Sequence, residues 1–206
     1  MTTRAPGGVG ALAVAAHSGD DEPGRAMRAD ARRNNERLLA AAREVFAREG
    51  TGASMEAIAK QAGVGAGTLY RHFPRRIDLV EAVYRDDLEE LLRNGERAAT
   101  ERDPFEALEA WIAGYVAYGQ RKRPFLAELQ EAFEKNPELK LRSRERLNAA
   151  TTAALDRAQR AGVARGDVSG EDLMAIIGPM CSHAALAPDQ APRLVAMILD
   201  GLRPGH

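Results

Sequence analysis

Apolar residues recur at spacings of three, four and seven along most of the chain after residue 30, and Gly or Pro stands at the breaks in this pattern. This spacing gathers apolar side chains on one face of an α-helix. Clear runs of β-branched and aromatic residues, which would indicate strands, are missing, and aromatic residues make up only 5% of the chain. The sequence therefore predicts an all-α protein of about nine helices.

The first three predicted helices are arranged as a helix-turn-helix domain. The first spans residues 31–49, and its apolar face carries Leu38, Leu39, Ala42, Val45 and Phe46. A second, short helix begins after Ser54, a residue type that caps helix N-termini, and ends at Gly63. The third spans residues 65–72 and stops before Pro74. Two short helices joined by a glycine-containing turn are typical of the helix-turn-helix.

The remaining segments predict a second, larger helical domain. Pro or a capping residue marks the start of most of its helices, which are expected over residues 75–100, 104–122, a segment after Pro124, 137–161, 170–185 and 188–202. Ser169 and Asp172 have the spacing of a capping box at the start of the eighth helix. The predicted organisation is a disordered tail over residues 1–29, a helix-turn-helix domain over 30–77 and a helical domain over 78–206.

The N-terminal tail contains the apolar run Val9–Ala16, preceded by only one basic residue, Arg4. A secretion signal would have this order of features, but the run is short, and Gly and Pro residues interrupt the surrounding sequence. No apolar run approaches the roughly 20 residues that cross a bilayer. A single cysteine, Cys181, suits a reducing compartment. We therefore expect a cytoplasmic protein.

The formal net charge of −1 hides an uneven distribution along the chain. Residues 30–77 carry nine Lys or Arg side chains against five Asp or Glu, whereas the rest of the chain after residue 77 is net acidic. A basic head on an acidic body favours approach to phosphates that the whole-chain charge would not indicate.

The string EAIAKQAGVGAGTLYRHFPRRIDL, from Glu56 to Leu79, resembles the DNA-binding signature of the TetR family of bacterial regulators. The matching features are Ile58-Ala59, Ala62-Gly63-Val64, Gly67-Thr68-Leu69-Tyr70, His72-Phe73 and the basic pair before Leu79. The resemblance covers about residues 31–80, and beyond it the chain resembles the family only in length and helical pattern. It implies a homodimeric transcription regulator, most simply a repressor, that binds double-stranded operator DNA and is released by a small molecule.

The DNA-binding residues expected from this motif combine hydrogen-bonding groups with positive charge. They are Arg33, Ser54, Ala66, Gly67, Thr68, Tyr70, His72, Arg75 and Arg76. The arginine pair opens the fourth helix, where side-chain charge adds to exposed backbone N–H groups and the positive end of the helix dipole. Gly65 and Ala66 offer no side-chain donors to base edges, so apolar contacts and DNA shape are left to supply specificity.

In family terms, helices five to seven line an effector pocket and helices eight and nine form a four-helix dimer interface. The candidate ligand-binding residues share apolar or aromatic faces; they are Trp111, Tyr115, Tyr118, Phe125, Leu129, Phe133 and Met180. They favour a largely apolar effector, and plain core packing is the alternative. A bound effector would push helix four, which runs from this pocket to the arginine pair, and so lower DNA affinity.

Two other classes of function compete with this interpretation. An enzyme would need converging catalytic groups, but the four histidines, His17, His72, His183 and His206, are scattered along the sequence. Cys181 and His183 alone make a poor metal-ligand set, so no metal, cofactor or catalysis is predicted. The second alternative is a helical protein-interaction module without DNA binding, which would leave Thr68, Tyr70 and the arginine pair without a purpose. Salt-sensitive binding to duplex DNA separates it from a regulator.

Overall fold

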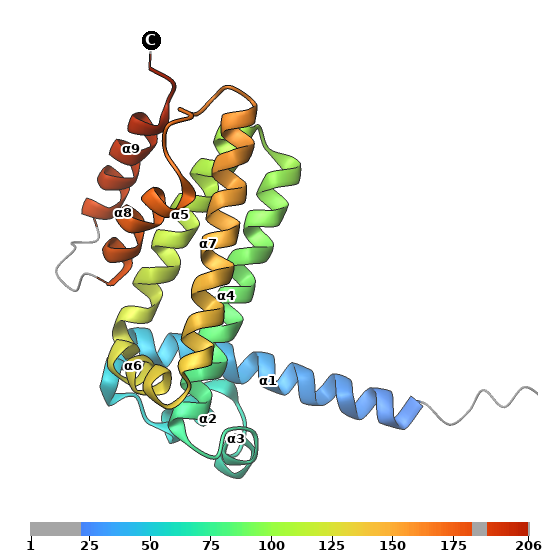
Figure 1. Cartoon of the computed structure of the whole chain (residues 1–206). Coiled ribbons are helices and arrows are strands. Elements are labelled where there is room, and N and C mark those ends of the chain that lie inside the picture. The colour runs from blue at the N-terminus through green and yellow to red at the C-terminus, as the bar shows by residue number, and fades with distance from the viewer. Residues whose placement is uncertain (1–21, 183–188, 206) are drawn as a thin grey trace, which may run out of the picture. The chain divides into compact units, whose positions relative to one another are not determined.

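The computed structural model describes residues 22–182 and 189–205, with only the backbone for residues 22–29, 31, 181 and 182 (Figure 1). Residues 1–36 and 37–206 form two separate units. The helices are α1 Glu22–Glu49, α2 Met55–Ala62, α3 Ala66–His72, α4 Arg76–Glu101, α5 Pro104–Lys122, α6 Leu126–Lys135, α7 Pro137–Arg160, α8 Gly170–Ser182 and α9 Gln190–Leu202. Short 3-10 turns follow α1 at Gly50–Gly52 and α5 at Arg123–Phe125. The all-α prediction is confirmed, since the described residues contain no strand.

The start of α1 differs from the prediction. The helix begins at Glu22 instead of Ala31, and it therefore includes residues 22–29 of the predicted tail. Its first turn contains Pro23, a position where proline is tolerated because the missing N–H has no intrahelical acceptor. The following residues are mostly Ala, Arg and Met, which have high helix propensity. The rest of the predicted tail, residues 1–21, lies outside the described residues.

Local hydrogen bonds explain where the short helices begin and end. The Ser54 hydroxyl accepts a hydrogen bond of 3.0 Å from the Ala57 backbone N–H at the start of α2. Gly63 ends α2 with a φ of +66°, a left-handed conformation that glycine adopts without steric cost. At the start of α8, the Ser169 N–H donates to Asp172 and the Asp172 N–H donates to the Ser169 hydroxyl, at 2.9 and 3.1 Å. The capping residues read from the sequence are therefore confirmed.

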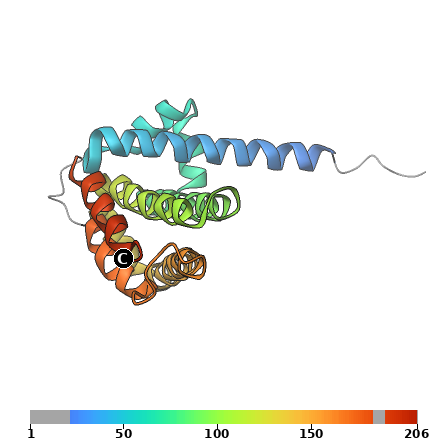
Figure 2. The same ribbon diagram turned by 90° about the horizontal axis from the view of Figure 1, so that it is seen from above.

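Helix α5 is the centre of the C-terminal bundle, because it packs against α4, α7, α8 and α9 (Figures 1 and 2). Its side chains Ile112 and Tyr118 are fully buried, and Trp111 is 2% exposed. The Trp111 indole N–H donates a hydrogen bond of 3.0 Å to the Thr151 hydroxyl on α7. This bond satisfies the one polar atom of the buried indole and fixes the register of α5 against α7.

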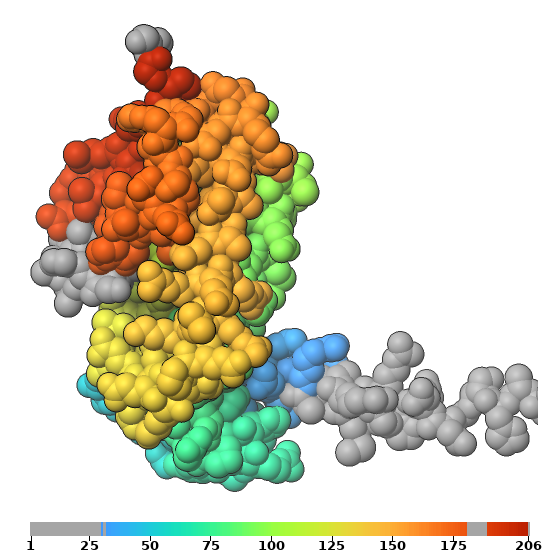
Figure 3. Space-filling model, viewed as in Figure 1, coloured from blue at the N-terminus to red at the C-terminus, as the bar shows by residue number. Residues whose placement is uncertain are grey.

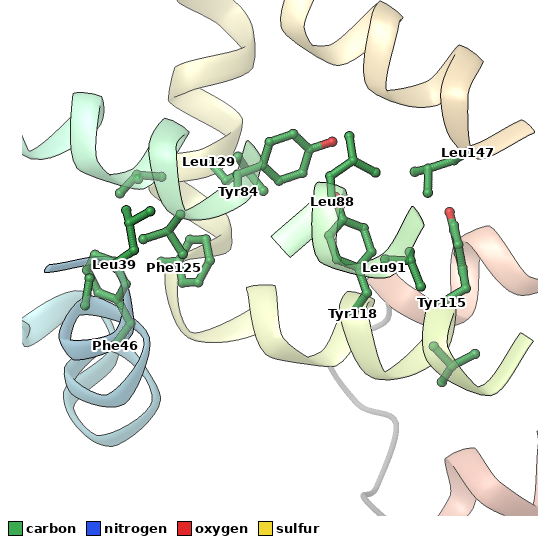
Figure 4. Close-up of a cluster of buried hydrophobic side chains, with 14 of the residues drawn as sticks. Leu39, Phe46, Tyr84, Leu88, Leu91, Tyr115, Tyr118, Phe125, Leu129 and Leu147 are labelled. Atoms are coloured by element: carbon green, nitrogen blue, oxygen red, sulfur yellow. The ribbon is translucent and has the colours of Figure 1, made fainter. Parts of the chain in front are cut away.

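An apolar contact and a charged contact are among those that join the helix-turn-helix segment to the bundle within residues 37–206. Phe46 of α1 lies against Phe125, with ring centroids 5.0 Å apart (Figure 4). Arg43 of α1 forms ion pairs with Asp86 and with Asp87 of α4, and the Arg43 Nε to Asp87 Oδ1 distance is 2.6 Å. The first contact is apolar and the second is charged, so α1 is held both to the segment before α6 and to α4. Among the described helices, none is both long and apolar enough to cross a bilayer.

Candidate functional site

The crossing of α2 and α3 is closed by small and apolar side chains. Ile58 and Leu69 are fully buried, and Ala59 is 3% exposed. The small side chain of Ala59 permits the close approach of the two helices, and Leu69 fills the space between them. The residues that follow the opposite face of α3 are therefore left at the surface, where duplex DNA can reach them.

The predicted recognition residues of α3 lie mostly on this outer face. Ala66, Gly67 and Tyr70 are exposed, and Thr68 and His72 are half-buried. The Tyr70 hydroxyl donates a hydrogen bond of 3.0 Å to the Glu56 carboxylate, and this bond raises the pKa of Tyr70. This bond connects the Tyr70 side chain on α3 to Glu56 in the first turn of α2. Ser54 is exposed, and its hydroxyl oxygen accepts from the Ala57 N–H in the helix cap.

The two arginines of the predicted phosphate clamp have different environments. The Arg75 side chain is 69% exposed and pairs only with Asp78, whose pKa this guanidinium lowers. The Arg76 side chain is 27% exposed, donates to the Ala53 carbonyl, pairs with Glu128 at 2.9 Å and lies 5.1 Å from the Phe46 ring centroid. The surface ion pair of Arg75 with Asp78 is weak, so Arg75 can leave it and bind a phosphate instead. Arg76 is held by its contacts with Ala53, Glu128 and Phe46.

Arg33 lies on the part of α1 that belongs to residues 1–36. Its guanidinium is exposed and forms a local ion pair with Asp30, one turn earlier in the helix. This pair stays within the first unit. Ser54, Tyr70 and Arg75 therefore belong to the helix-turn-helix segment of the second unit, whereas Arg33 belongs to the first unit.

Two exposed cations in the helix-turn-helix segment were not among the predicted DNA-binding residues. Arg71 lies on α3 between Tyr70 and His72, and Lys60 lies on α2. Both are exposed, and neither forms an ion pair within the described part of the chain. Their positive charge next to the recognition positions was the signal that could have identified them from the sequence.

A pocket of about 620 Å³ lies where α4, α5, α6, α7 and α8 come together. Of the predicted ligand-binding residues, Tyr115 and Phe133 line it. The Tyr84 ring from α4 meets the Phe133 ring of α6 edge to face, with centroids 5.2 Å apart. Figure 3 shows the face on which α6, α7 and α8 converge. The volume falls in the range of small-molecule sites.

The other predicted ligand-binding residues lie elsewhere. Trp111 lines two smaller cavities between α4 and its neighbours, and Tyr118 is fully buried beneath the pocket. Phe125 packs on Phe46 of α1 and Leu129 is 1% exposed, so both belong to the buried core (Figure 4). Met180 is half-buried on α8 and does not line the pocket.

Several pocket residues escaped the sequence analysis. They include Tyr84, Lys122, Lys140 and Arg144. Tyr84 reads as one more apolar residue of α4, and the three cations read as an ordinary solvated surface. The Lys122 ammonium nitrogen lies 3.7 Å from the Tyr118 ring centroid and 5.4 Å from that of Tyr84, a cation–π geometry. The pocket therefore combines an aromatic wall with positive charge.

Two family models match the chain. Residues 38–83 match the model for bacterial regulatory proteins of the tetR family, and residues 103–204 match the model for the C-terminal domain of SbtR-like transcriptional regulators. Among curated proteins, an HTH-type transcriptional regulator from Staphylococcus aureus is 45% identical over 64 residues. That alignment covers 31% of this chain and 35% of the relative, so this chain spans about a third of the relative's length.

Similar solved structures extend over most of the chain. A TetR transcriptional regulator from Streptomyces coelicolor is 37% identical, with a TM-score of 0.73 over 84% of this chain and 99% of that protein. A TetR transcription regulatory protein from Mycobacterium vanbaalenii is 34% identical, with a TM-score of 0.68 over 86% of this chain and 99% of that protein. The helix-turn-helix, the helical bundle behind it and these full-length similarities agree: the chain belongs to the TetR family of transcriptional regulators.

Proposed function

We propose that this DNA-binding regulator is a homodimeric repressor that a small molecule releases from its operator. Residues 30–77 are its DNA-binding domain, and residues 78–206 bind the effector and form the dimer. The observation that carries the proposal is that two helices, α4 and α6, each contribute one residue to the pocket wall and one to an ion pair beside the helix-turn-helix. The pocket and the DNA-binding segment therefore share the same two rigid elements.

Four residues of α4 and α6 form the connection between the pocket and the helix-turn-helix segment. Tyr84 of α4 and Phe133 of α6 touch at the pocket. About two turns before Tyr84 on α4, Arg76 pairs with Glu128 near the start of α6 and donates to the Ala53 carbonyl, just before α2. A ligand that separates the two rings would shift α6 against α4 and strain this ion pair. Arg76 also donates a hydrogen bond to the Ala53 carbonyl, which lies just before α2. A shift of Arg76 would therefore move α2 and, through it, the recognition helix α3.

Linkage makes the release reciprocal. A ligand that binds better to the DNA-free arrangement must itself be bound less tightly when operator is present, by the same factor. Coupling free energies of about 1–3 kcal/mol are typical of such systems. Repression requires only that the bound protein obstruct polymerase, so it is the simplest sign of regulation.

Exposed apolar side chains on α8 and α9 support the dimer. Ile176 is 54% exposed and Met197 is 69% exposed, although both are large apolar residues. Isolated exposed apolar residues are common, but these two lie on the helices that the family uses for its dimer interface. Two recognition helices about one DNA turn apart would read the two halves of a pseudo-palindromic operator.

Operator binding should depend on Arg75 and Arg76 in different ways. Fluorescence titration of the gene's own upstream intergenic DNA over a series of salt concentrations measures both affinity and salt slope. Arg75→Ala should weaken binding about tenfold and reduce the slope by about 1 for each lost phosphate contact, without changing the thermal midpoint. Arg76→Ala should weaken binding and also lower the thermal midpoint, because Glu128 loses its partner.

The control is Arg48→Ala, which removes an exposed cation paired with Glu49 at the end of α1. Because Arg48 is not among the predicted DNA contacts, this variant should change the affinity and the salt slope less than Arg75→Ala does, and it should leave the thermal midpoint unchanged. Salt-independent binding, or the same affinity for operator and random DNA, would favour the protein-interaction module instead.

Breaking the ion pair from the α6 side should also reduce operator affinity. Glu128→Gln leaves Arg76 half-buried without a carboxylate partner, and the tie between α6 and the start of α4 is weakened. We expect operator affinity to fall about fivefold without effector, in the range of allosteric coupling. Glu131→Gln is the matched control, since Glu131 pairs with exposed Lys135 on the same helix. Equal affinities for both variants and the unmodified protein would show that α6 does not control the DNA-binding segment.

A further inference from the structure

The four basic residues in the first half of α7, from Lys140 to Arg146, fall into two groups with different surroundings. Arg142 pairs with Glu138 one turn earlier, and Arg146 pairs with Glu89 of α4 through Nη2 at 2.9 Å. Lys140 and Arg144 instead line the 620 Å³ pocket and form no ion pair or hydrogen bond within the described part of the chain. Among the four basic residues from Lys140 to Arg146, the two that line the pocket are thus the ones without a protein partner.

The sequence explains why these two side chains stay unpaired. The residues three and four positions from Lys140 and Arg144 on α7 include no acid; they are Asn136, Pro137, Leu141, Ser143, Leu147 and Asn148. Lys140 and Arg144 are themselves four residues apart, so they are stacked one turn from each other on the helix. Like charges at this spacing repel each other and destabilise a helix. A bound anion would turn this repulsion into attraction.

The remaining pocket lining adds a third cation and an apolar floor. Lys122 enters from α5 over the Tyr118 ring, and Glu171 at the start of α8 is the single acid among the lining residues. Phe133, Leu147 and Met174 supply apolar surface between these charges. Figure 4 shows the Tyr84 and Tyr115 hydroxyl groups on the side chains that border this space, next to Leu88 and Leu147.

We propose that the effector of this pocket is an organic carboxylate with an apolar, aromatic-sized body. The inference rests on the proposed function, and it assigns the chemical class of the ligand. Arg144 presents the planar, two-donor geometry that matches a carboxylate, and Lys140 adds a second charge one turn away. The body of the ligand lies against Phe133, Leu147 and Met174, where it gains the free energy of apolar burial. The expectation of a largely apolar effector is thereby narrowed to an amphipathic anion.

The test compares two compounds that differ only in charge, 2-naphthylacetate and its uncharged amide, 2-naphthylacetamide. Isothermal titration of the full-length protein at neutral pH gives the affinity of each. We expect the carboxylate to bind at least about tenfold more tightly than the amide, and this preference to shrink as salt is added. Equal affinities, or no saturable binding of the carboxylate, would overturn the proposal.

Variants identify the charges responsible. The double variant Lys140→Met/Arg144→Met should reduce the preference for the carboxylate to less than about twofold while the amide affinity stays the same. The matched control, Arg142→Met/Arg146→Met, removes the same charge from the same helix outside the pocket and should keep the preference. Glu171→Gln should increase carboxylate affinity a few-fold, because it removes the acid from the lining. A preference that persists in the Lys140/Arg144 variant would refute the assignment.

Operator titration with each compound present keeps the two proposals apart. If the carboxylate binds with the expected preference but leaves operator affinity unchanged, the proposal of a carboxylate ligand is supported and the proposal that the ligand releases the protein from DNA is contradicted. If both compounds bind with equal affinity and release DNA equally well, the proposal of ligand-induced release is supported and the proposal of a carboxylate ligand is contradicted.

Discussion

An Arg43→Met variant should unfold with a free energy about 3–5 kcal/mol lower than that of the unmodified protein, measured by urea denaturation. The loss is large because Asp87, the partner of Arg43, is 1% exposed. Its Oδ1 accepts from Arg43 Nε at 2.6 Å, and its Oδ2 is buried without a hydrogen bond in the described structure. Removing the guanidinium would leave a buried carboxylate with no compensating charge from α1.

The pH dependence of this loss has a defined sign. Burial raises the pKa of Asp87, and Arg43 opposes that shift. Without Arg43 the pKa of Asp87 in the folded state rises further, so the folded variant binds a proton more readily than the unfolded chain. Stability from a raised carboxyl pKa is present at low pH and lost as pH rises through that pKa. The difference in the free energy of unfolding between the variant and the unmodified protein should therefore become smaller as the pH is lowered from about 8 to about 5.

Two controls test the explanation. Arg48→Met removes an exposed arginine of the same helix and should change stability by less than about 1 kcal/mol. Asp87→Asn combined with Arg43→Met removes the buried charge itself and should recover part of the loss. If Arg43→Met lowers the free energy of unfolding by less than about 1 kcal/mol, or by an amount that does not depend on pH, water reaches Asp87 when Arg43 is absent.

Gly170→Ala should lower the free energy of unfolding by about 1–3 kcal/mol, as overpacking of a well-packed crossing does. Gly170 is the buried first residue of α8, where α8 meets α7. A Cβ atom built there would lie 2.8 Å from the Thr152 Cα and within 2.9 Å of its Cβ. Because one obstacle is backbone, α8 must move away from α7 to admit the methyl group. The expected result is a lower urea midpoint together with weaker dimerisation in analytical ultracentrifugation.

The comparison variant is Gly201→Ala in α9, where a new Cβ would meet nothing within 4 Å. Alanine has the higher helix propensity, so this variant should be as stable as the unmodified protein or more stable by up to about 1 kcal/mol. A Gly170→Ala protein as stable as Gly201→Ala would show that the α7–α8 crossing has room to adjust.

The helices of this fold were predictable because their ends are encoded by local chemistry. Ser54, Gly63 and the pair Ser169 and Asp172 form the caps that their residue types indicate. The start of α1 was placed too late because glycines and prolines before residue 30 suggested a tail, whereas Pro23 stands where a helix accepts it. Periodicity identifies helices, but it does not show how far a polar helix extends beyond its apolar face.

The candidate sites were less accessible to sequence analysis because they depend on which helices meet. Arg76 reads as an exposed cation, yet the approach of α6 brings Glu128 to it. Phe125 reads as a pocket residue, yet the 3-10 turn before α6 directs it to Phe46. Lys140 and Arg144 are an exception, since the absence of an acid three or four positions away is visible in the sequence.

The outer face of α3 also has a consequence for protein engineering. A Cβ atom at Gly67 would meet nothing within 4 Å, and the neighbouring Ala66 is exposed. In the proposed DNA-binding mode these two positions face the base edges, and neither presents a hydrogen-bonding side chain. Larger polar residues fit there without disturbing the buried seam of Ile58 and Leu69. Substitutions at these two positions could therefore change the operator specificity of the protein without altering the effector pocket.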